Sequence, residues 1–364
     1  MSTPPITQEN TQESKKWLYL LGRNWTILFL LGEAIVFSWI GTGFFSIKNF
    51  QNILVASTTI LLLAAGETFV IITGGIDLSV GFVMGLCCVI SAKIMVALQA
   101  LGLSPAMCIV VGAGGTLLLG LLPGLVNGIL VAKFRVPPFI ATFGMYGIAY
   151  GVSEILCNSV PIAGLPALAG FIGNGYLLYY LPGRGFTWFG PPQGIAREEI
   201  RSLIPLFPNV FMLSLLAILV FAFILSRTPF GQHTYAIGGN IDAARRAGIP
   251  VDRHLIKVYM ISSFFAALGG VMYTLRFVTG RADAGAARML DSIAAVVIGG
   301  ASLYGGTGNM IGSLIGTLII GVLETGMVNL GLPTHNKYVY VGVILILAVL
   351  IDQFFPEFVE KGGI

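Results

Sequence analysis

Charged residues are rare in this sequence, whereas long hydrophobic runs are common. Of its 364 residues, 10% are charged and 56% are hydrophobic, and the mean hydropathy is +0.89. Soluble domains carry about 25% charged residues. Several of the apolar runs approach about 20 residues, the length that crosses a bilayer as a helix. The scarcity of charge therefore excludes a single soluble domain and indicates a polytopic membrane protein.

Cysteine is also scarce, and the motifs of common catalytic and metal sites are missing. The four cysteines fall in apolar runs, without the spacing of zinc ligands or the density of a disulfide scaffold, so we interpret them as packing residues. No HExxH motif and no grouped Ser, His and Asp set occur. We therefore predict that this chain is not an enzyme, holds no metal and binds no nucleic acid.

A nucleotide-binding loop of the form GxxxxGK[ST] is absent as well. Any ATP that powers this protein must then be bound and hydrolysed, together with Mg²⁺, by another chain. We expect no cofactor in this one.

The apolar runs predict an all-α polytopic membrane protein, with about ten transmembrane helices between residues 25 and 355 and Gly-rich breaks in some of them. The expected spans cover approximately residues 25–45, 52–73, 78–98, 106–132, 137–156, 209–226, 255–278, 290–303, 310–330 and 338–355. An even number of spans places both termini on the same side of the membrane.

Basic residues set the expected orientation. Lys15, Lys16 and Arg23 precede the first span, so residues 1–24 are predicted to be a cytoplasmic tail, and so are residues 356–364. Residues 158–208, which are rich in Gly, Pro and aromatic side chains, then form a long periplasmic loop. Residues 227–254 form a cytoplasmic loop.

The segment from Gly231 to Arg253 is the one polar, charged stretch with a helical pattern between long apolar runs. Asn240 is a favourable N-cap, and Gly248 before Pro250 is a favourable stop. A short capped helix between two spans has little core to bury, so we predict that another protein grips it. The residues assigned to this contact are Asn240, Asp242, Ala243, Ala244, Arg245, Arg246 and Gly248.

Two Gly-rich segments, residues 72–81 and 298–309, interrupt the spans. Non-helical backbone at membrane depth survives only where protein or a water-filled path covers it, and transporters place such breaks near their substrate sites. We therefore predict that polar groups near the first break line a translocation pathway. These groups are Glu67, Gly74, Gly75, Asp77, Ser79, Asn127 and Thr142.

Structural roles stay open for the same residues. A Gly-Gly pair also suits a tight turn, the Asp77 carboxylate also suits a helix cap, and Asn127 also suits a hydrogen bond between packed helices. Glu67 is the best pathway candidate among the glutamates within apolar spans, where an ionisable group is costly. The others are Glu33, Glu154 and Glu324.

Four longer motifs point to a known family. The chain resembles the ribose-type permease subunits of bacterial ABC importers in ITGGIDLSVG (72–81), NGILVAKFRVPPFIATFGM (127–145), YAIGGNIDAARRAGIPVDR (235–253) and LDSIAAVVIGGASLYGGTG (290–308). The match runs in family order from about residue 50 to residue 352. Several long motifs in one order are far more specific than a lone Gly-Gly pair.

The resemblance implies a multi-pass protein of the bacterial inner membrane that carries a monosaccharide or related polyol inward. It implies two cytoplasmic ATP-binding subunits, a periplasmic sugar-binding protein and a second permease copy, either identical or related. It also makes residues 240–248 the coupling helix that meets the ATP-binding subunit.

The chain departs from the family pattern in two places, a longer loop with extra residues at 184–202 and Glu67 where the family often has Met. Two alternatives stay open. One is an ABC permease for branched-chain amino acids or nucleosides. The other is an ion-coupled secondary transporter, which the lack of clustered membrane carboxylates disfavours.

Overall fold

The chain forms an elongated helical bundle. The computed structural model describes residues 25–196, 199–333 and 335–361. The expected N-terminal tail, residues 1–24, and the last three residues of the expected C-terminal tail at 356–364 lie outside these ranges. Seven helical segments of the described chain are long and apolar enough to cross a bilayer. They are α3 (Ile47–Ile72), α4 (Val80–Ala100), α5 with α6 (Pro105–Leu119 and Leu121–Ala132), α7 (Pro138–Cys157), α9 (Asn209–Arg227), α12 (Val251–Phe277) and α14 (Met310–Asn329).

Three further helices complete the ten expected segments in the expected order. They are α2 (Trp25–Ile40), α13 (Arg288–Ile298) and α15 (Asn336–Lys361). The all-α polytopic fold is thus confirmed, with several changes in the bounds. Helix α2 ends at Ile40 rather than near residue 45, α3 begins at Ile47 rather than near 52, and α13 ends at Ile298 rather than near 303. The fourth expected span is divided at Gly120, and α15 continues beyond the expected end near residue 355.

Helix α3 is the axis of the bundle. It packs against α12, α13 and α14 and also against α9. Its residues from Ile60 to Ala65 are at most 1% exposed. A helix that is apolar on every side belongs in the middle of a large bundle, where no face has to meet water or lipid.

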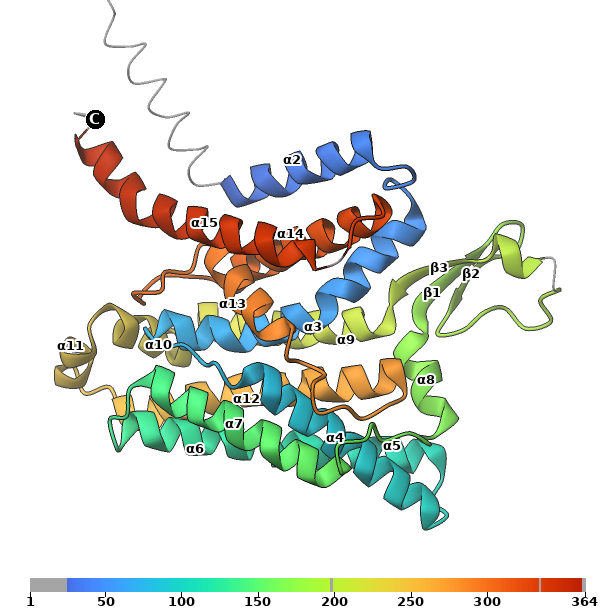
Figure 1. Ribbon diagram of the computed structural model, residues 1–364, viewed down its shortest axis with the longest axis horizontal. Helices are drawn as coiled ribbons and strands as arrows, with labels where there is room; N and C mark the ends of the chain where they lie inside the picture. The colour runs from blue at the N-terminus through green and yellow to red at the C-terminus, as the bar shows by residue number, and fades with distance from the viewer. Residues whose placement is uncertain (1–24, 197–198, 334, 362–364) are drawn as a thin grey trace, which may run out of the picture.

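The two ends of the bundle differ in structure (Figure 1). At one end lie α10 (Pro229–Gly239) and α11 (Ile241–Arg246), beside the C-terminal end of α3. At the other end lie α8 (Ala167–Asn174) and a small β-sheet, beside the start of α9. These are called the α11 end and the sheet end below.

The sheet consists of three antiparallel strands in the order β2-β1-β3. The strands are β1 (Tyr176–Leu181), β2 (Gly185–Trp188) and β3 (Ile204–Pro208), with a short 3₁₀ helix, η1 (Glu199–Ser202), before β3. The sequence analysis expected no strands here, because apolar runs this short, without strict alternation, do not distinguish a strand from a helix or loop. The sheet anchors to the bundle where Gln51 Nε2 donates a hydrogen bond to the carbonyl oxygen of Pro205.

Candidate functional site

The first Gly-rich break lies inside the bundle, between the end of α3 and the start of α4. Helix α3 ends at Ile72, Gly74 has a left-handed φ of +80°, and α4 begins at Val80. Asp77 and Ser79 between them are completely buried. The chain therefore crosses the interior as non-helical backbone, which the sequence analysis expected.

Asp77 organises this break through three hydrogen bonds. Its Oδ1 accepts from the Ser79 backbone N–H at 3.0 Å and from the Ser79 hydroxyl at 2.5 Å. Its Oδ2 accepts from the Ser262 hydroxyl of α12 at 2.8 Å. The carboxylate thus fixes the entry into α4 and ties it to α12.

Two other expected pathway residues bond to Asp77 or Ser79, and a third bonds to Ile76 beside them. Asn127 of α6 donates from Nδ2 to the Ser79 hydroxyl at 3.1 Å. Glu67 Oε2 accepts from the Asp77 backbone N–H at 3.4 Å, and the Thr142 hydroxyl of α7 donates to the Ile76 carbonyl at 3.3 Å. We call Glu67, Asp77, Ser79, Asn127, Thr142 and Ser262 the inner cluster.

The inner cluster is closed but not fully satisfied. Each of its side chains is 0% exposed. Glu67 Oε1 and Asn127 Oδ1 have no hydrogen-bond partner among the described residues, and neither has the hydroxyl of neighbouring Ser263. Buried oxygens without partners are costly and rare in a static core. They leave acceptors ready for a polar ligand or for water when the helices move apart.

Gly74 and Gly75 line a pocket next to the inner cluster. This pocket of about 400 Å³ opens at the α11 end and is lined also by Arg135, Arg245 and Tyr259. The expected pathway glycines therefore border an inner cavity, and the expected polar side chains lie behind them.

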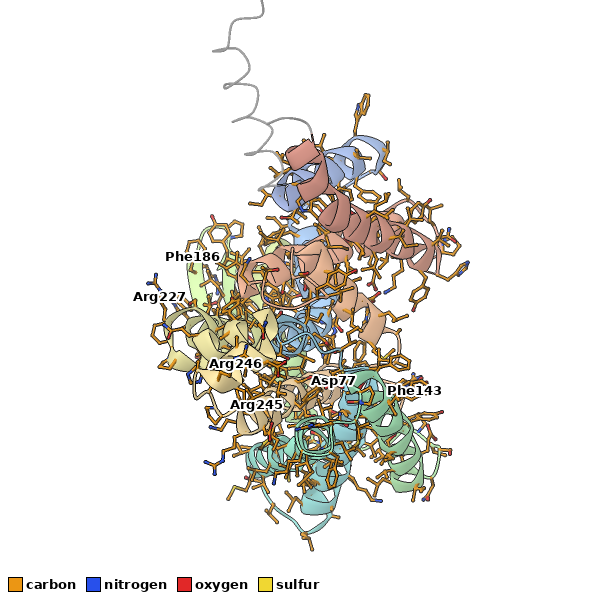
Figure 2. The ribbon with its side chains drawn as sticks, turned by 90° about the vertical axis from the view of Figure 1, so that its left-hand side faces the viewer. Asp77, Phe143, Phe186, Arg227, Arg245 and Arg246 are labelled. Carbon is orange, nitrogen blue, oxygen red and sulfur yellow. The ribbon has the colours of Figure 1, made fainter. Side chains whose placement is uncertain are left out.

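Helix α11 stands apart from the bundle at this end, where Figure 2 shows Arg245 and Arg246. Asn240 caps it as expected, because its side chain accepts from the Ala243 backbone N–H at 2.9 Å. Asp242, Ala243 and Arg246 are exposed.

Two of the expected contact residues hold α11 in place. Ala244 is only 4% exposed and packs with Ile237, Val251 and Leu255. Arg245 Nη2 lies 3.1 Å from Asp252 Oδ1 of α12. The exposed face of α11 therefore includes Asp242, Ala243 and Arg246, while Ala244 packs against the bundle beneath it.

The segment before α11 touches both Gly-rich breaks. A Cβ on Gly238 would collide with the carbonyl oxygen of Ile72 and lie 2.5 Å from the backbone nitrogen of Gly306. Gly306 in turn donates its N–H to the Ile72 carbonyl at 2.8 Å. We call Gly74, Gly238, Gly305 and Gly306 the glycine junction. Only residues without side chains let three backbone segments come this close.

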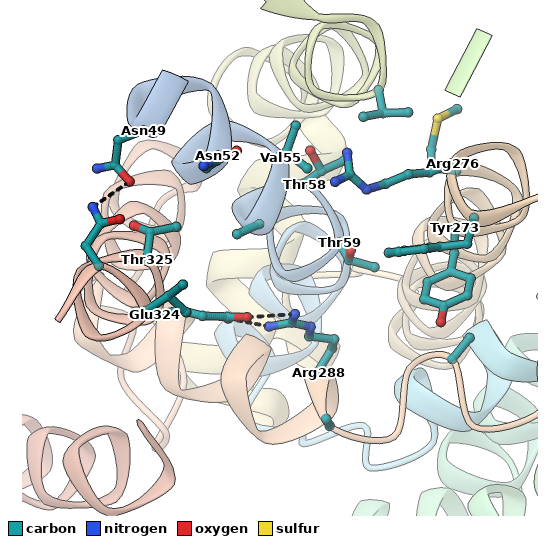
Figure 3. A pocket seen from close by; sticks show the side chains of 18 residues that line it. Asn49, Asn52, Val55, Thr58, Thr59, Tyr273, Arg276, Arg288, Glu324 and Thr325 are labelled. Carbon is teal, nitrogen blue, oxygen red and sulfur yellow. Dashed lines mark hydrogen bonds and ion pairs between the residues drawn. The ribbon is translucent and has the colours of Figure 1, made fainter. Parts of the chain in front are cut away.

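A larger pocket lies in the other half of the bundle, toward the sheet end (Figure 3). It has a volume of about 500 Å³ and is lined by α3, α9, α12, α14 and the loop before α13. We call it the outer pocket. Asn52 and Thr59 of α3 line it, and Arg276 extends into it from α12.

An ion network forms one wall of the outer pocket. Arg288 donates to Glu324 at 2.6 and 3.1 Å, and Lys337 donates to Glu324 at 3.2 Å and to Asp291 at 2.9 Å. Asp291 is 1% exposed and Lys337 is 4% exposed. Two cations and two carboxylates balance, so the network carries no net charge into the pocket.

Sequence reasoning missed most of these groups. It singled out Glu324 but not its partners, and it did not select Ser262, Asn52 or Arg276. Ser262 and Ser263 are adjacent polar residues in an apolar span, a signal of the same strength as Asn127. Nothing in the sequence places Arg276 beside α3, because that contact depends on how the helices pack.

Residues 49–349 match the model of a protein family described as branched-chain amino acid transport system / permease component. A ribose import permease protein of Bacillus subtilis is 36% identical over 328 residues, covering 90% of both chains. The corresponding Escherichia coli protein is 35% identical, covering 93% of this chain and 95% of its own. A galactose/methyl galactoside import permease protein of Haemophilus influenzae is 34% identical, covering 94% and 97%. No solved structure matches the chain significantly.

Proposed function

We propose that this chain, which belongs to the family of branched-chain amino acid transport system permease components, imports a sugar as the membrane-spanning subunit of an ABC transporter. The resemblance to ribose-type permeases is confirmed by relatives that align over about nine-tenths of both chains. The chain is a multi-pass membrane protein and a permease component, so its role is to form a path.

A monosaccharide or related polyol is the substrate that the relatives support. The family description names amino acids, but three relatives that match nearly the full length import ribose or galactose. The groups around the outer pocket favour the same choice. Glu324, the one carboxylate lining the outer pocket among the described residues, is already paired with two cations, so no free carboxylate is left there to balance the ammonium group of an amino acid.

Transport is powered by ATP that partner chains bind and hydrolyse, since this sequence has no phosphate-binding loop. The observation that supports this best is α11, a capped helix that stands outside the bundle and exposes Asp242, Ala243 and Arg246. Such a helix fits the groove of a cytoplasmic ATP-binding subunit. Residues 227–254 are then the cytoplasmic coupling loop.

This assignment orients the molecule in the bacterial inner membrane. The α11 end faces the cytoplasm, together with both termini, and the sheet end faces the periplasm. The segment 158–208, including the additional residues 184–202, then offers β2 to a periplasmic sugar-binding protein. Phe186 and Trp188 on β2 are 61% and 65% exposed, as a surface that meets a partner requires. A second permease copy completes the transporter.

The glycine junction supports a route from α11 to the pathway. Movement of α11 pulls on Gly238 and Gly239 at the end of α10, which touch Ile72 and Gly306. Ile72 is the last residue of α3, five positions before Asp77. Backbone segments in direct contact pass a movement of α11 on to α3 efficiently, because no side chain lies between them that could absorb it by changing rotamer.

Uptake measured in proteoliposomes with the cognate ATP-binding subunits and binding protein tests the proposal. We expect ATP-dependent accumulation of a monosaccharide and none without the ATP-binding subunits. Accumulation by the permease alone, driven by an ion gradient, would overturn the proposal in favour of a secondary transporter.

The coupling role is tested by Ala243→Glu, which puts a bulky charge on the outward face of α11. We expect uptake to fall by about tenfold or more, the effect of about 1.4 kcal/mol lost at the interface, while the permease still inserts and folds. The matched control is Ala106→Glu, the same change at an exposed position of α5 at the opposite end. Full-rate uptake by the Ala243 variant contradicts the coupling assignment.

A further inference from the structure

The outer pocket has the size and position of a binding site for a small polar molecule. Its volume is about 500 Å³, and ligand sites in proteins span about 300–1,000 Å³. It lies at the half of α3 opposite the α11 end, between α3, α12 and α14. A molecule released at the sheet end would reach it first.

Its uncommitted polar groups suit hydroxyl groups. Asn52 and Thr59 on α3 and Tyr273 on α12 line the pocket, and none of their side chains forms a hydrogen bond within the described chain. Amide and hydroxyl groups both donate and accept, as do the hydroxyls of a sugar. A sugar can therefore bond to each of them without a charge of its own.

Arg276 is the strongest sign of a missing partner. Its side chain reaches from α12 across the pocket toward Thr58 (Figure 3). The guanidinium forms no ion pair or hydrogen bond within the described chain, and it lies 5.4 Å from the centre of the Phe277 ring. A half-buried guanidinium has five N–H donors to satisfy, and here they face an open polar space.

The pocket is closed toward the inner cluster. Between Thr59, which lines the pocket, and Glu67, which belongs to the inner cluster, α3 rises by about 12 Å. This interval contains Ile60 to Ala65, all at most 1% exposed. An apolar layer with no room for water thus separates two polar sites on one helix.

We propose that the outer pocket is the entry site of the permease, where a neutral monosaccharide binds through Asn52, Thr59 and Arg276 before the apolar layer opens. This inference rests on the proposed function, since it names the place on the path where the sugar first binds. The ion network closes one wall and leaves Arg276 as the free donor for sugar hydroxyls.

Transport by the complete complex in proteoliposomes tests the site with two variants, using a panel of radiolabelled monosaccharides that includes ribose and galactose. Arg276→Gln removes the charge-assisted hydrogen bonds, and Ala56→Trp fills the pocket from α3. We expect each to lower the uptake rate at subsaturating sugar by about tenfold or more. The control Lys133→Gln also removes one positive charge, on an exposed residue after α6 that lies outside the pocket, and should transport like the unmodified chain.

The outcomes separate the two proposals. If the unmodified complex takes up sugar and both pocket variants match it, the entry site is wrong and the sugar-importer assignment stands. If the complex prefers a carboxylated sugar, and Arg276→Lys keeps that uptake, the pocket binds an anion and the neutral-sugar assignment is overturned.

Cysteine labelling tests the site even if uptake fails. Thr59→Cys places a thiol in the pocket, whereas the native cysteines are buried or half-buried and give the background. We expect a membrane-impermeant maleimide, added from the sheet end, to label this thiol, and millimolar ribose or galactose to slow the labelling severalfold. Equal labelling rates with every sugar in the panel overturn the entry site, whatever the uptake assay gives.

Discussion

The two halves of α3 carry polar groups for different purposes. In the inner half, Glu67 and its neighbours are completely buried and bonded to one another, so the polar groups hold the break between α3 and α4 in shape. In the outer half, Asn52 and Thr59 face a pocket and bond to nothing in the described chain. The difference is one of degree, because most polar atoms of the inner cluster are paired and only a few, such as Glu67 Oε1, are left open, whereas these two outer side chains are wholly unpaired.

Lys337→Met should show the largest loss of stability, because it breaks the ion network at the wall of the outer pocket. It leaves Asp291, which is 1% exposed, with only the Arg288 guanidinium at 3.4 Å. Breaking a buried ion pair costs about 3–5 kcal/mol. Thermal unfolding of the purified permease in detergent measures the effect. Lys48→Met, the same change on an exposed lysine of α3 that forms no ion pair within the described chain, should leave the midpoint nearly unchanged.

Asp77→Ala should be the next most destabilising, because it removes the acceptor of three hydrogen bonds in the inner cluster. The buried Ser79 and Ser262 hydroxyls lose a partner, at about 1–3 kcal/mol for each group left unsatisfied. Asp77→Asn keeps the shape and one acceptor and should recover part of the loss in the same unfolding assay. If Asp77→Ala unfolds at the same temperature as the unmodified chain, the cluster does not stabilise the break.

Threonine to valine at two positions of α3 gives the smallest effect and the sharpest comparison. Thr68 is 0% exposed and its hydroxyl lies 2.7 Å from that of Ser313, so Thr68→Val should cost about 1 kcal/mol. Thr59 has no such partner, so Thr59→Val should change stability by less than about 0.5 kcal/mol while lowering sugar uptake. Equal stability losses at the two positions would remove the distinction between the halves of α3.

Much of the architecture could be predicted because the bilayer restricts what a sequence can form. Apolar runs of sufficient length become helices there, since no other open structure satisfies the backbone. The expected helix at residues 240–248 was predicted for a local reason as well: the Asn240 side chain caps the backbone only three residues further on. The small sheet was missed for two reasons: the short apolar runs of the local β1–β2 hairpin do not distinguish a strand from a helix or loop, and β3 joins β1 from more than 20 residues away along the chain.

The candidate site was also predicted only in part. The expected pathway residues come together as a cluster, but the prediction that they line the pathway remains a prediction, because they are closed off in this conformation. Ala243 and Ala244 are indistinguishable in sequence, yet one is exposed and the other is packed beneath α11. Which of two neighbouring residues faces a partner depends on the orientation of a helix on its support.

The sequence by itself determined the class of the protein, the order of its helices and the position of its breaks and its capped helix, because composition, length and capping act over a few residues. Only the tertiary structure decided which polar groups are satisfied. Asp77 and Ser262 are 185 residues apart and bonded, whereas Arg276 faces an open pocket formed by five separate segments. Hydrogen bonding over such separations depends on how the helices pack. Packing therefore decided that the inner half of α3 stabilises the break before α4 and that the outer half lines a candidate entry site.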